Sequence, residues 1–361
     1  MSAANGAPHR ALIDKLATTH ALSHDEMTEL IAAHTIADSD YLCGLAREVA
    51  LQRFGNVVHT RGLIEFTNIC RNDCYYCGIR KGNRNVARYR LTQPQVLDCC
   101  RTGYALGFRT FVLQGGEDPY FDDARMEDMV RAIKAQHPDC AVTLSIGERS
   151  EASYQRLFDA GADRYLLRHE TANFDHYRQL HPPALSAKHR QDCLRALKRI
   201  GYQTGTGFMV GSPYQTPALL AEDLAFIAQL QPEMVGIGPF IPHRDTPFAA
   251  HRAGTLELTV FLLGVLRLML PDVLLPATTA LGTIADDGRE RGILAGANVV
   301  MPNLSPRDVR AQYSLYDNKI STGAEAAEGR ADLQKRMEAI GYTLGVGRGD
   351  YGGVDRHAGT H

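Results

Sequence analysis

Short runs of residues that favour β-strands alternate with helix-like segments from residue 58 onward, and this alternation limits the folds available to the chain. The β-favouring runs are Gly62–Thr67, Thr110–Gln114, Ala141–Ile146, Arg164–Arg168, Gln203–Val210, Met234–Phe240, Val273–Ala277 and Asn298–Met301. Alternating strands and helices indicate parallel strands joined by right-handed crossovers. Eight such runs predict an α/β fold, a (β/α)8 TIM-type barrel, with a doubly wound open sheet as the alternative.

Helix start and stop signals lie between most of these runs. One expected helix starts at Thr92 and ends near Gly107. The others cover Asp122–Gln136, Ser150–Ala160, Ser186–Ile200, Thr216–Leu230 and Thr255–Leu270. Residues 1–55 contain no strand candidate, and the S-x-x-E pattern of Ser23–Glu26 predicts the start of a helix there. We therefore expect an N-terminal helical extension over residues 1–55 and a barrel with a C-terminal tail over residues 56–361.

The charge and hydropathy of the chain argue against two classes of partner. Lys and Arg number 39 and Asp and Glu 41, and a net charge of −2 gives no indication of binding to nucleic acid or an acidic membrane surface. The most apolar run, Val260–Leu270, is interrupted by Arg267 and is too short to span a bilayer. The N-terminus lacks the apolar stretch of a secretory signal. We expect a cytoplasmic protein with no nucleic-acid or membrane partner.

Polar motifs follow the predicted strands. Active sites of such barrels lie at the C-terminal ends of the strands, so side chains of these motifs should meet on one rim. The motifs are Glu65–Cys70, Gln114–Asp118, Ser145 with Gly147–Glu148, Arg168–Glu170, Met209–Pro213, Pro239–His243, Thr278–Thr279 and Pro302–Asn303. Their distribution predicts a single site built from many loops.

Three of the eight cysteines lie close together, as Cys70, Cys74 and Cys77 in a C-x₃-C-x₂-C arrangement. Thiolates are soft ligands that suit zinc or iron–sulfur clusters. A structural zinc or a fully ligated ferredoxin cluster commonly has four protein ligands, whereas three thiolates leave one iron with an open position. We expect a [4Fe–4S] cluster here, with zinc or another iron–sulfur arrangement as the alternative. The other cysteines are expected to be small buried residues: Cys43, Cys99, Cys100, Cys140 and Cys193.

The cysteine spacing, with Tyr76 before the last cysteine, resembles the signature of the radical S-adenosylmethionine (SAM) superfamily. The stretches Glu65–Arg80 and Arg88–Thr92 resemble its biotin synthase-like branch. Others resemble HydE, the family of radical SAM maturases of [FeFe]-hydrogenase: Val112–Tyr120, Asp163–Asn173, Met234–His243, Pro276–Ala280, Gly288–Glu290 and Gly296–Asn303. Together these stretches span most of the chain between residues 50 and 320.

The resemblance implies an enzyme with one [4Fe–4S] cluster and SAM as cofactors. In the superfamily, SAM binds the open iron, and an electron from the cluster breaks a C–S bond to give methionine and a 5′-deoxyadenosyl radical. Some HydE proteins carry a second cluster on C-terminal cysteines. This chain has no cysteine after Cys193, so we expect a single cluster.

Residues at matching positions would form the SAM site. Gly115, Gly116 and Glu117 match a GGE-type motif that contacts the amino group of SAM, and a carboxylate suits an ammonium group. By resemblance, Arg168 and Glu170 would hold the carboxylate and the ribose hydroxyls, with a plain ion pair on the rim as the structural alternative. Further SAM-lining positions are Tyr76, Thr143, Pro239, Ile241 and Tyr313.

Four residues resemble those that line the HydE substrate cavity: Gln114, Arg164, Thr278 and Thr279. Arg164 and Arg168 are four apart on one predicted strand, and two guanidiniums facing the lumen would suit an anionic substrate. The resemblance implies a cysteine-bearing iron complex with CO and cyanide, used in assembly of the hydrogenase di-iron subcluster. Implied partners are a reduced electron donor such as ferredoxin or flavodoxin and other hydrogenase maturases.

Two other functions stay open from the sequence. A related radical SAM mutase or sulfur-handling enzyme, similar to methylornithine synthase or biotin synthase, would share the cysteine motif. An Fe–S carrier or scaffold without turnover would need the cysteines, but neither a closed barrel nor the SAM-type motifs.

Overall fold

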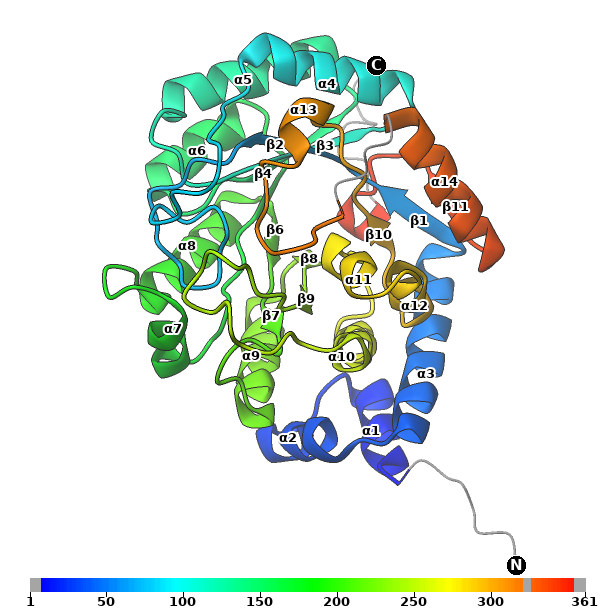
Figure 1. Ribbon diagram of the computed structural model, residues 1–361. Coiled ribbons are helices and arrows are strands. Elements are labelled where there is room, and N and C mark those ends of the chain that lie inside the picture. Colours follow the sequence, from blue (N-terminus) through cyan, green and yellow to red (C-terminus); the bar gives the residue numbers. More distant parts are fainter. Residues whose placement is uncertain (1–7, 321–325, 354–361) are drawn as a thin grey trace, which may run out of the picture.

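Six parallel strands form a sheet in the order β2-β3-β4-β5-β6-β8, which curves into a barrel ringed by helices (Figure 1). The computed structural model describes residues 8–320 and 326–353. The strands are β2 (Gly62–Thr67), β3 (Thr110–Gly115), β4 (Ala141–Ser145), β5 (Arg164–Leu166), β6 (Gln203–Thr206) and β8 (Met234–Val235). The predicted parallel α/β architecture is confirmed, and the fold is TIM-barrel-like.

The seventh and eighth predicted strands are shorter than expected. Segment 273–277 joins the ring through a single parallel bridge between Met234 and Leu274, and the eighth strand is reduced to β10 (Val299–Val300). Parallel bridges from Pro276 to Val299 and from Leu63 to Asn303 complete the ring. The expectation of eight full strands is therefore wrong. Proline at positions 276 and 302 lacks the N–H that would continue a ladder, which accounts for the short pairing.

Two predicted strands divide at glycines that lie against each other. The run Gln203–Val210 forms β6 and β7 (Met209–Val210), and Met234–Phe240 forms β8 and β9 (Gly238–Pro239). A Cβ atom on Gly207 would lie 2.0 Å from the carbonyl oxygen of Gly236, so the two chains approach too closely for any side chain. Beyond this point β7 and β9 pair as a separate two-stranded sheet.

A second small sheet covers the N-terminal end of the barrel. Strand β1 (Val57–Thr60) precedes β2 directly and lies between β10 and β11 (Thr343–Gly345), both parallel to it. Strand β11 follows helix α14 (Ala326–Ala339). The C-terminal segment of the described chain therefore reaches the end of the barrel opposite the cysteine loop.

The predicted helices are present with their expected caps. Side chains of Asp122, Ser150, Ser186, Thr216 and Thr255 each accept a backbone N–H at a helix start. The helices are α4 (Gln93–Ala105), α5 (Asp123–Gln136), α6 (Glu151–Asp159), α8 (Ala187–Ile200), α9 (Pro217–Leu230) and α10 (Leu256–Met269). The sequence did not predict α7 (Phe174–Leu180), α11 (Thr279–Ile284), α12 (Gly288–Leu294), α13 (Arg307–Arg310) or α14.

Three N-terminal helices, α1 (Arg10–Thr19), α2 (His24–Ala33) and α3 (Ile36–Phe54), precede the first strand. The capping box predicted at Ser23 is present, since Ser23 and Glu26 bond to each other's backbone N–H. Residues of these helices share one hydrophobic cluster with α9, α10 and the barrel strands. Because the core is continuous, the division at residue 55 remains a prediction about domains.

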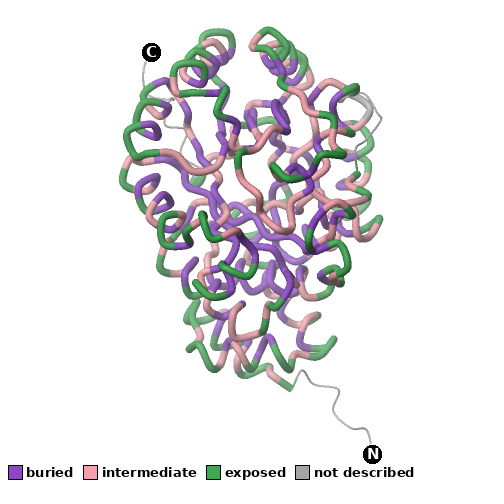
Figure 2. Tube along the Cα trace, turned by 60° about the vertical axis from the view of Figure 1, so that its left-hand side comes forward, coloured by how far each residue is buried: buried purple, intermediate pink, exposed green. Residues whose placement is uncertain are grey.

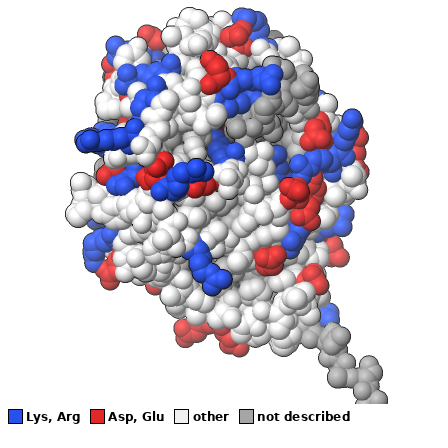
Figure 3. Space-filling view, viewed as in Figure 1, with Lys and Arg blue, Asp and Glu red and all other residues white. Residues whose placement is uncertain are grey.

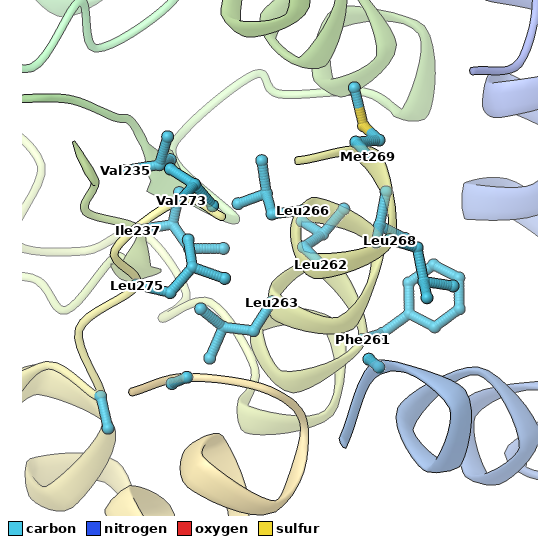
Figure 4. Packing of buried hydrophobic residues seen from close by; sticks show 14 of the residues in the cluster. Val235, Ile237, Phe261, Leu262, Leu263, Leu266, Leu268, Met269, Val273 and Leu275 are labelled. Atoms are coloured by element: carbon cyan, nitrogen blue, oxygen red, sulfur yellow. The ribbon is translucent and has the colours of Figure 1, made fainter. Parts of the chain in front are cut away.

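Helix α10 is buried on all sides because it lies between the barrel and the N-terminal helices. Figure 4 shows Leu263 and Leu266 facing Val273 and Leu275 of the barrel, while Phe261 points toward another helix. Buried positions are concentrated in the strands and on the inward sides of the helices (Figure 2). An apolar surface all round is typical of such a sandwiched helix. Within the described ranges, no helix is both long enough and apolar enough to cross a membrane.

Arg267, which interrupts the apolar run, is fully buried and has a structural role. Its guanidinium donates to the carbonyls of Gly296, Pro271 and Val273 and to the side chain of Asn298. Burial lowers the pKa of Arg267 to about 9. These bonds tie α10 to the short seventh and eighth segments, which have few ladder bonds of their own.

Candidate active site

The cysteine loop, residues 70–77, follows β2 at the C-terminal end of the barrel. Cys70, Cys74 and Cys77 are half-buried and unpaired. Burial raises the pKa of Cys70, raises that of Cys77 to about 12 and holds that of Cys74 far above its ordinary value. The negative charges of the neighbouring thiolates also raise the pKa of Cys74 and Cys77. The loop brings together the three ligands that the sequence predicts.

A four-iron cluster on Cys70, Cys74 and Cys77 would place different demands on the thiols than a single ion. No group of three or more Cys, His, Asp or Glu side chains in residues 8–320 and 326–353 is arranged around one metal ion. In a four-iron cluster each thiolate binds a different iron, so the sulfurs need to converge without meeting at one point. Burial without a metal disfavours the charged thiolates, and an iron centre offsets that cost because it binds the thiolate form directly.

Arg88 fixes the shape of the cysteine loop. Its guanidinium donates to the carbonyl oxygens of Asn68 (2.5 Å) and Ile79 (2.8 Å), on either side of the cysteines. It also donates to the carbonyls of Arg80 and Asn83. Asn68 is fully buried, and its amide donates to the carbonyls of Ala87 and Gln312. Two side chains outside the cysteine motif therefore hold both ends of the loop.

The GGE-type motif ends β3 beside the cysteine loop, but its carboxylate already has protein partners. A Cβ atom on Gly116 would lie 2.3 Å from the carbonyl oxygen of Ile69, so glycine permits the close approach of β3 to the loop. Glu117 forms an ion pair with Arg71 at 3.0 Å and accepts the N–H of Glu148 at 3.0 Å. The contact of this carboxylate with the ammonium of SAM stays a prediction. Gly115 and Gly116 keep their place at the rim.

Arg168 and Glu170 carry polar atoms that no protein group satisfies. Their ion pair is long, at 3.7 Å from Nε to Oε2. Nε and Nη2 of Arg168 and Oε2 of Glu170 are buried and have no hydrogen-bond partner among the described residues. Glu170 adopts φ 65°, an uncommon conformation for a residue with a side chain. Buried polar groups are normally paired, so these atoms indicate a missing ligand.

Two lumen-facing threonines show the same lack of partners. The hydroxyls of Thr143 on β4 and Thr278 before α11 are buried without a hydrogen bond in the described structure. Gly238 makes room for Thr278, since a Cβ there would lie 2.7 Å from Oγ1. Thr279 is half-buried as the first residue of α11, and the structure assigns its side chain no contact.

The remaining predicted SAM-lining residues lie around the same space. The hydroxyl of Tyr76 is 3.0 Å from Nε2 of His181, and burial lowers the pKa of His181 to about 3, so the histidine is neutral. Tyr313 is almost fully buried, and burial holds its pKa well above the usual value. Pro239 lies on β9 and Ile241 follows it, half-buried. The structure brings these residues to the mouth of the barrel, and their roles stay predictions.

Arg164 differs from the sequence-based expectation. It is the first residue of β5, fully buried, and it forms an ion pair with Asp350 of the C-terminal segment at 2.6 Å. It also donates to Thr110, Gln203 and the carbonyl of Arg348. The pairing of Arg164 with Arg168 as two free guanidiniums is therefore wrong. The strand ends at Leu166, so Arg168 lies beyond it at the rim, whereas Arg164 closes the opposite end.

Sequence reasoning missed a free cation in the lumen, Arg61 between β1 and β2. It is buried, and burial holds its pKa well below the usual value. Its Nη1 lies 2.8 Å from the sulfur of Met234 on β8, while Nε and Nη2 have no partner in the part of the chain that is described. A single sequence does not show that an arginine before a strand faces the lumen, because its direction is set only when the strands close into a ring.

Comparisons with known proteins agree with this geometry. Residues 64–227 match the model of the radical SAM superfamily. This range includes the cysteine loop and most of the chain from β2 to α9. The chain is 42% identical over 347 residues to the [FeFe] hydrogenase maturase subunit HydE of Thermotoga maritima, covering 96% of this chain and 98% of that protein. The chain belongs to the HydE family. Its members are radical SAM enzymes, and the cofactors of this family are a [4Fe–4S] cluster and SAM.

Solved structures show the same fold as this HydE family member. The crystal structure of methylornithine synthase has a TM-score of 0.80 and 26% identity, covering 92% of this chain and 97% of that one. The hydrogenase maturase HydG of Carboxydothermus hydrogenoformans has a TM-score of 0.81 over 94% of this chain and 79% of its own, at 20% identity. The second likeness concerns the fold alone. The higher sequence identity places the chain with HydE rather than with the mutase.

Proposed function

We propose that this HydE family enzyme cleaves SAM at the mouth of the barrel and acts on an anionic, cysteine-bearing iron complex within it. The observation that carries the proposal is the set of buried polar atoms without partners. In the described structure, Arg168 and Glu170 present them near the cysteine loop, and Thr143, Thr278 and Arg61 present them in the lumen. Leaving such groups unpaired costs about 1–3 kcal/mol each, more for charges, so a bound ligand is expected to satisfy them.

The two ends of this polar lining suit two ligands. Beside the cysteines, Arg168 and Glu170 offer a donor and an acceptor 3.7 Å apart, which matches the carboxylate and the ribose hydroxyls of SAM. When bound, the cluster on Cys70, Cys74 and Cys77 supplies the electron that breaks a C–S bond of SAM. Deeper in the barrel, Arg61 offers buried guanidinium donors, Nε and Nη2, without hydrogen-bond partners among the described residues, which suits an anionic substrate. Arg61 thus takes the place that sequence reasoning gave to Arg164.

The protein also supplies enclosure. Residues 311–320 cross the mouth of the barrel in Figure 1, and Gly78 of the loop region donates to the carbonyl of Leu315. Asp317 donates its N–H to the carbonyl of Pro242 on the opposite side of the mouth. A covered mouth excludes water and protects a reactive species from side reactions. An Fe–S carrier without turnover would need no such cover and no unpaired polar lining.

In the cell, we propose that the enzyme works with other hydrogenase maturases in assembly of the di-iron subcluster. The support is the 42% identity to a curated hydrogenase maturase over nearly the whole of both chains. A reduced one-electron carrier such as ferredoxin or flavodoxin would complete the system. The related mutase function remains the second hypothesis, with 26% identity to methylornithine synthase as its support.

The test is anaerobic SAM cleavage. Protein reconstituted with iron and sulfide is reduced with dithionite, given SAM and assayed for 5′-deoxyadenosine, with Cys74→Ala as the control. Product from the wild type alone supports the radical SAM activity. No product from protein that holds a reducible four-iron cluster, with or without the iron complex, would overturn it. Turnover of the iron complex separates the two enzyme hypotheses.

A further inference from the structure

We propose that the basic loop, residues 78–90, is the docking surface for a small acidic one-electron carrier protein. The inference rests on the proposed function, because the carrier would give up one electron to the cluster on the neighbouring cysteine loop. The loop contains Arg80, Lys81, Arg84, Arg88 and Arg90 and neither Asp nor Glu, in a chain whose net charge is −2. Such a concentration of one sign of charge raises the association rate of an oppositely charged partner.

The basic loop is folded directly onto the cysteine loop. The N–H of Lys81 donates to the carbonyl of Asn72 at 2.8 Å, and the N–H of Gly82 donates to Oδ1 of Asp73 at 2.8 Å. Asn72 and Asp73 lie between Cys70 and Cys74, so the basic loop covers the outer side of the segment that carries the ligands. A carrier bound to the basic loop would therefore lie next to the residues that hold the redox centre.

The charges of the loop divide into two groups. Three arginines are bound by protein groups: Arg80 pairs with Asp73 at 2.7 Å, Arg90 pairs with Asp118 at 2.7 Å, and Arg88 binds backbone carbonyls. Lys81 and Arg84 are exposed, and no side-chain hydrogen bond or ion pair involves either of them in residues 8–320 and 326–353. The bound group holds the loop in place, and the exposed group stays available to a partner.

Acidic groups near the loop form no ion pair with Lys81 or Arg84 in the described residues. Asp73 is engaged by Arg80, Asp245 accepts a hydrogen bond from Asn85 at 2.7 Å, and Asp317 pairs with Arg244 at 3.1 Å. Figure 3 shows Lys and Arg side chains protruding along the left edge of this face, where Figure 1 draws the light-blue loop. Other Lys and Arg residues are interspersed with Asp and Glu across this face (Figure 3).

A redox carrier fits this patch better than nucleic acid does. Nucleic-acid binding draws on many phosphate contacts along an extended basic surface. Here two exposed cations without ion pairs in the described structure, Lys81 and Arg84, lie on one loop beside the cysteine ligands. Small charged patches suit brief encounters, in which fast association and release matter more than affinity, and electron-transfer pairs are of that kind.

The test uses charge reversal and two reductants. The double variant Lys81→Glu/Arg84→Glu is compared with wild type and with Lys335→Glu, an exposed lysine on α14 across the molecule. The rate of cluster reduction by reduced flavodoxin, an acidic carrier, is followed by anaerobic stopped flow at several salt concentrations. Dithionite is the small reductant. Binding of oxidised flavodoxin is measured by calorimetry on protein with and without its cluster.

We expect the double variant to be reduced by flavodoxin about 10-fold more slowly than wild type at low ionic strength, with a flatter salt dependence. Flavodoxin should also bind the double variant more weakly, with or without the cluster. Lys335→Glu should be reduced by flavodoxin at the wild-type rate, and the extent of reduction by dithionite should be the same in all three proteins. An unaltered flavodoxin rate, or equal slowing by Lys335→Glu, would overturn the docking surface. Failure of SAM cleavage with dithionite would instead contradict the proposed function, and the binding data would still decide the surface.

Discussion

The ammonium of Lys319 forms an ion pair with the carboxylate of Glu65 inside the mouth of the barrel. Both side chains are almost fully buried, Glu65 on β2 and Lys319 on the segment that crosses the mouth. Glu65 also accepts a hydrogen bond from Asn303 at 2.8 Å, and Lys319 donates to the carbonyl of Tyr313 at 2.9 Å. A strand of the barrel is thereby joined to its cover, beside the predicted SAM-lining residue Tyr313.

Replacing Lys319 by Met should loosen the attachment of residues 311–320 to the mouth of the barrel. The change leaves the Glu65 carboxylate buried without a counter-charge, which costs roughly 3–5 kcal/mol unless the segment opens to water. We expect limited proteolysis to cut faster within residues 311–320 and SAM affinity to fall. The double variant Glu65→Gln/Lys319→Met removes both charges and should recover part of the protection. Equal protection in wild type and Lys319→Met would show that the ion pair does not hold the cover.

Arg88→Lys should weaken the cluster without unfolding the barrel. Lysine keeps the charge but cannot span carbonyls on both sides of the cysteines as a planar guanidinium does. We expect the reconstituted variant to lose iron to a chelator several-fold faster than wild type, with unchanged circular dichroism. Arg84→Lys, in the same loop but exposed, is the matched control. Iron loss at the wild-type rate would contradict the positioning role of Arg88.

Arg168→Lys and Glu170→Gln should each reduce SAM binding while leaving the iron content unchanged. Each removes one hydrogen bond to a charged group, worth about 1.5–3 kcal/mol, which corresponds to a Kd raised about 10- to 100-fold. Calorimetric titration of the reconstituted protein with SAM measures the change. If both variants bind SAM as wild type does, the plain ion pair at the rim is the correct interpretation.

Arg164→Met should destabilise the protein because Asp350 would be left buried without its partner. The expected loss is roughly 3–5 kcal/mol, and the double variant Arg164→Met/Asp350→Leu should lose less than Arg164→Met alone. Urea unfolding of the three proteins gives the comparison. A stable Arg164→Met variant that binds SAM but fails to turn over substrate would restore the substrate role that the sequence suggested.

His181 makes stability depend on pH in a defined window. Its pKa is lowered by burial from 6.5 to about 3, so between these values the unfolded state binds more protons than the folded state. The free energy of unfolding therefore falls as pH drops below 6.5, by about 1.4 kcal/mol per pH unit at most. Anaerobic urea unfolding between pH 5.5 and 8 should show a shallower slope for His181→Gln. Identical slopes would mean that His181 becomes protonated without unfolding.

The order of strands, the approximate bounds of the six barrel helices from α4 to α10 other than α7, and the cysteine motif followed from the sequence because each depends on neighbours in the chain. Helix caps such as Ser150 and Thr216 act within three residues, and C-x₃-C-x₂-C places three thiols on one loop. The position of polar motifs after strands predicted one rim, and β3 does end at Gly115, with Gly116 against the carbonyl of Ile69 beside the cysteine loop. The family resemblance likewise came from short continuous sequence motifs.

Only the tertiary structure decided which charges are paired and which are free. Arg164 pairs with Asp350, 186 residues away, and Lys319 pairs with Glu65, 254 residues away. No periodic pattern in a single sequence predicts contacts between residues so far apart in the chain. The length of the seventh and eighth strands likewise depends on how the ring closes around Pro276 and Pro302. Local propensities set the elements, whereas the net charge inside the barrel, left to Arg61 and Arg168, results from pairings that closure of the ring imposes.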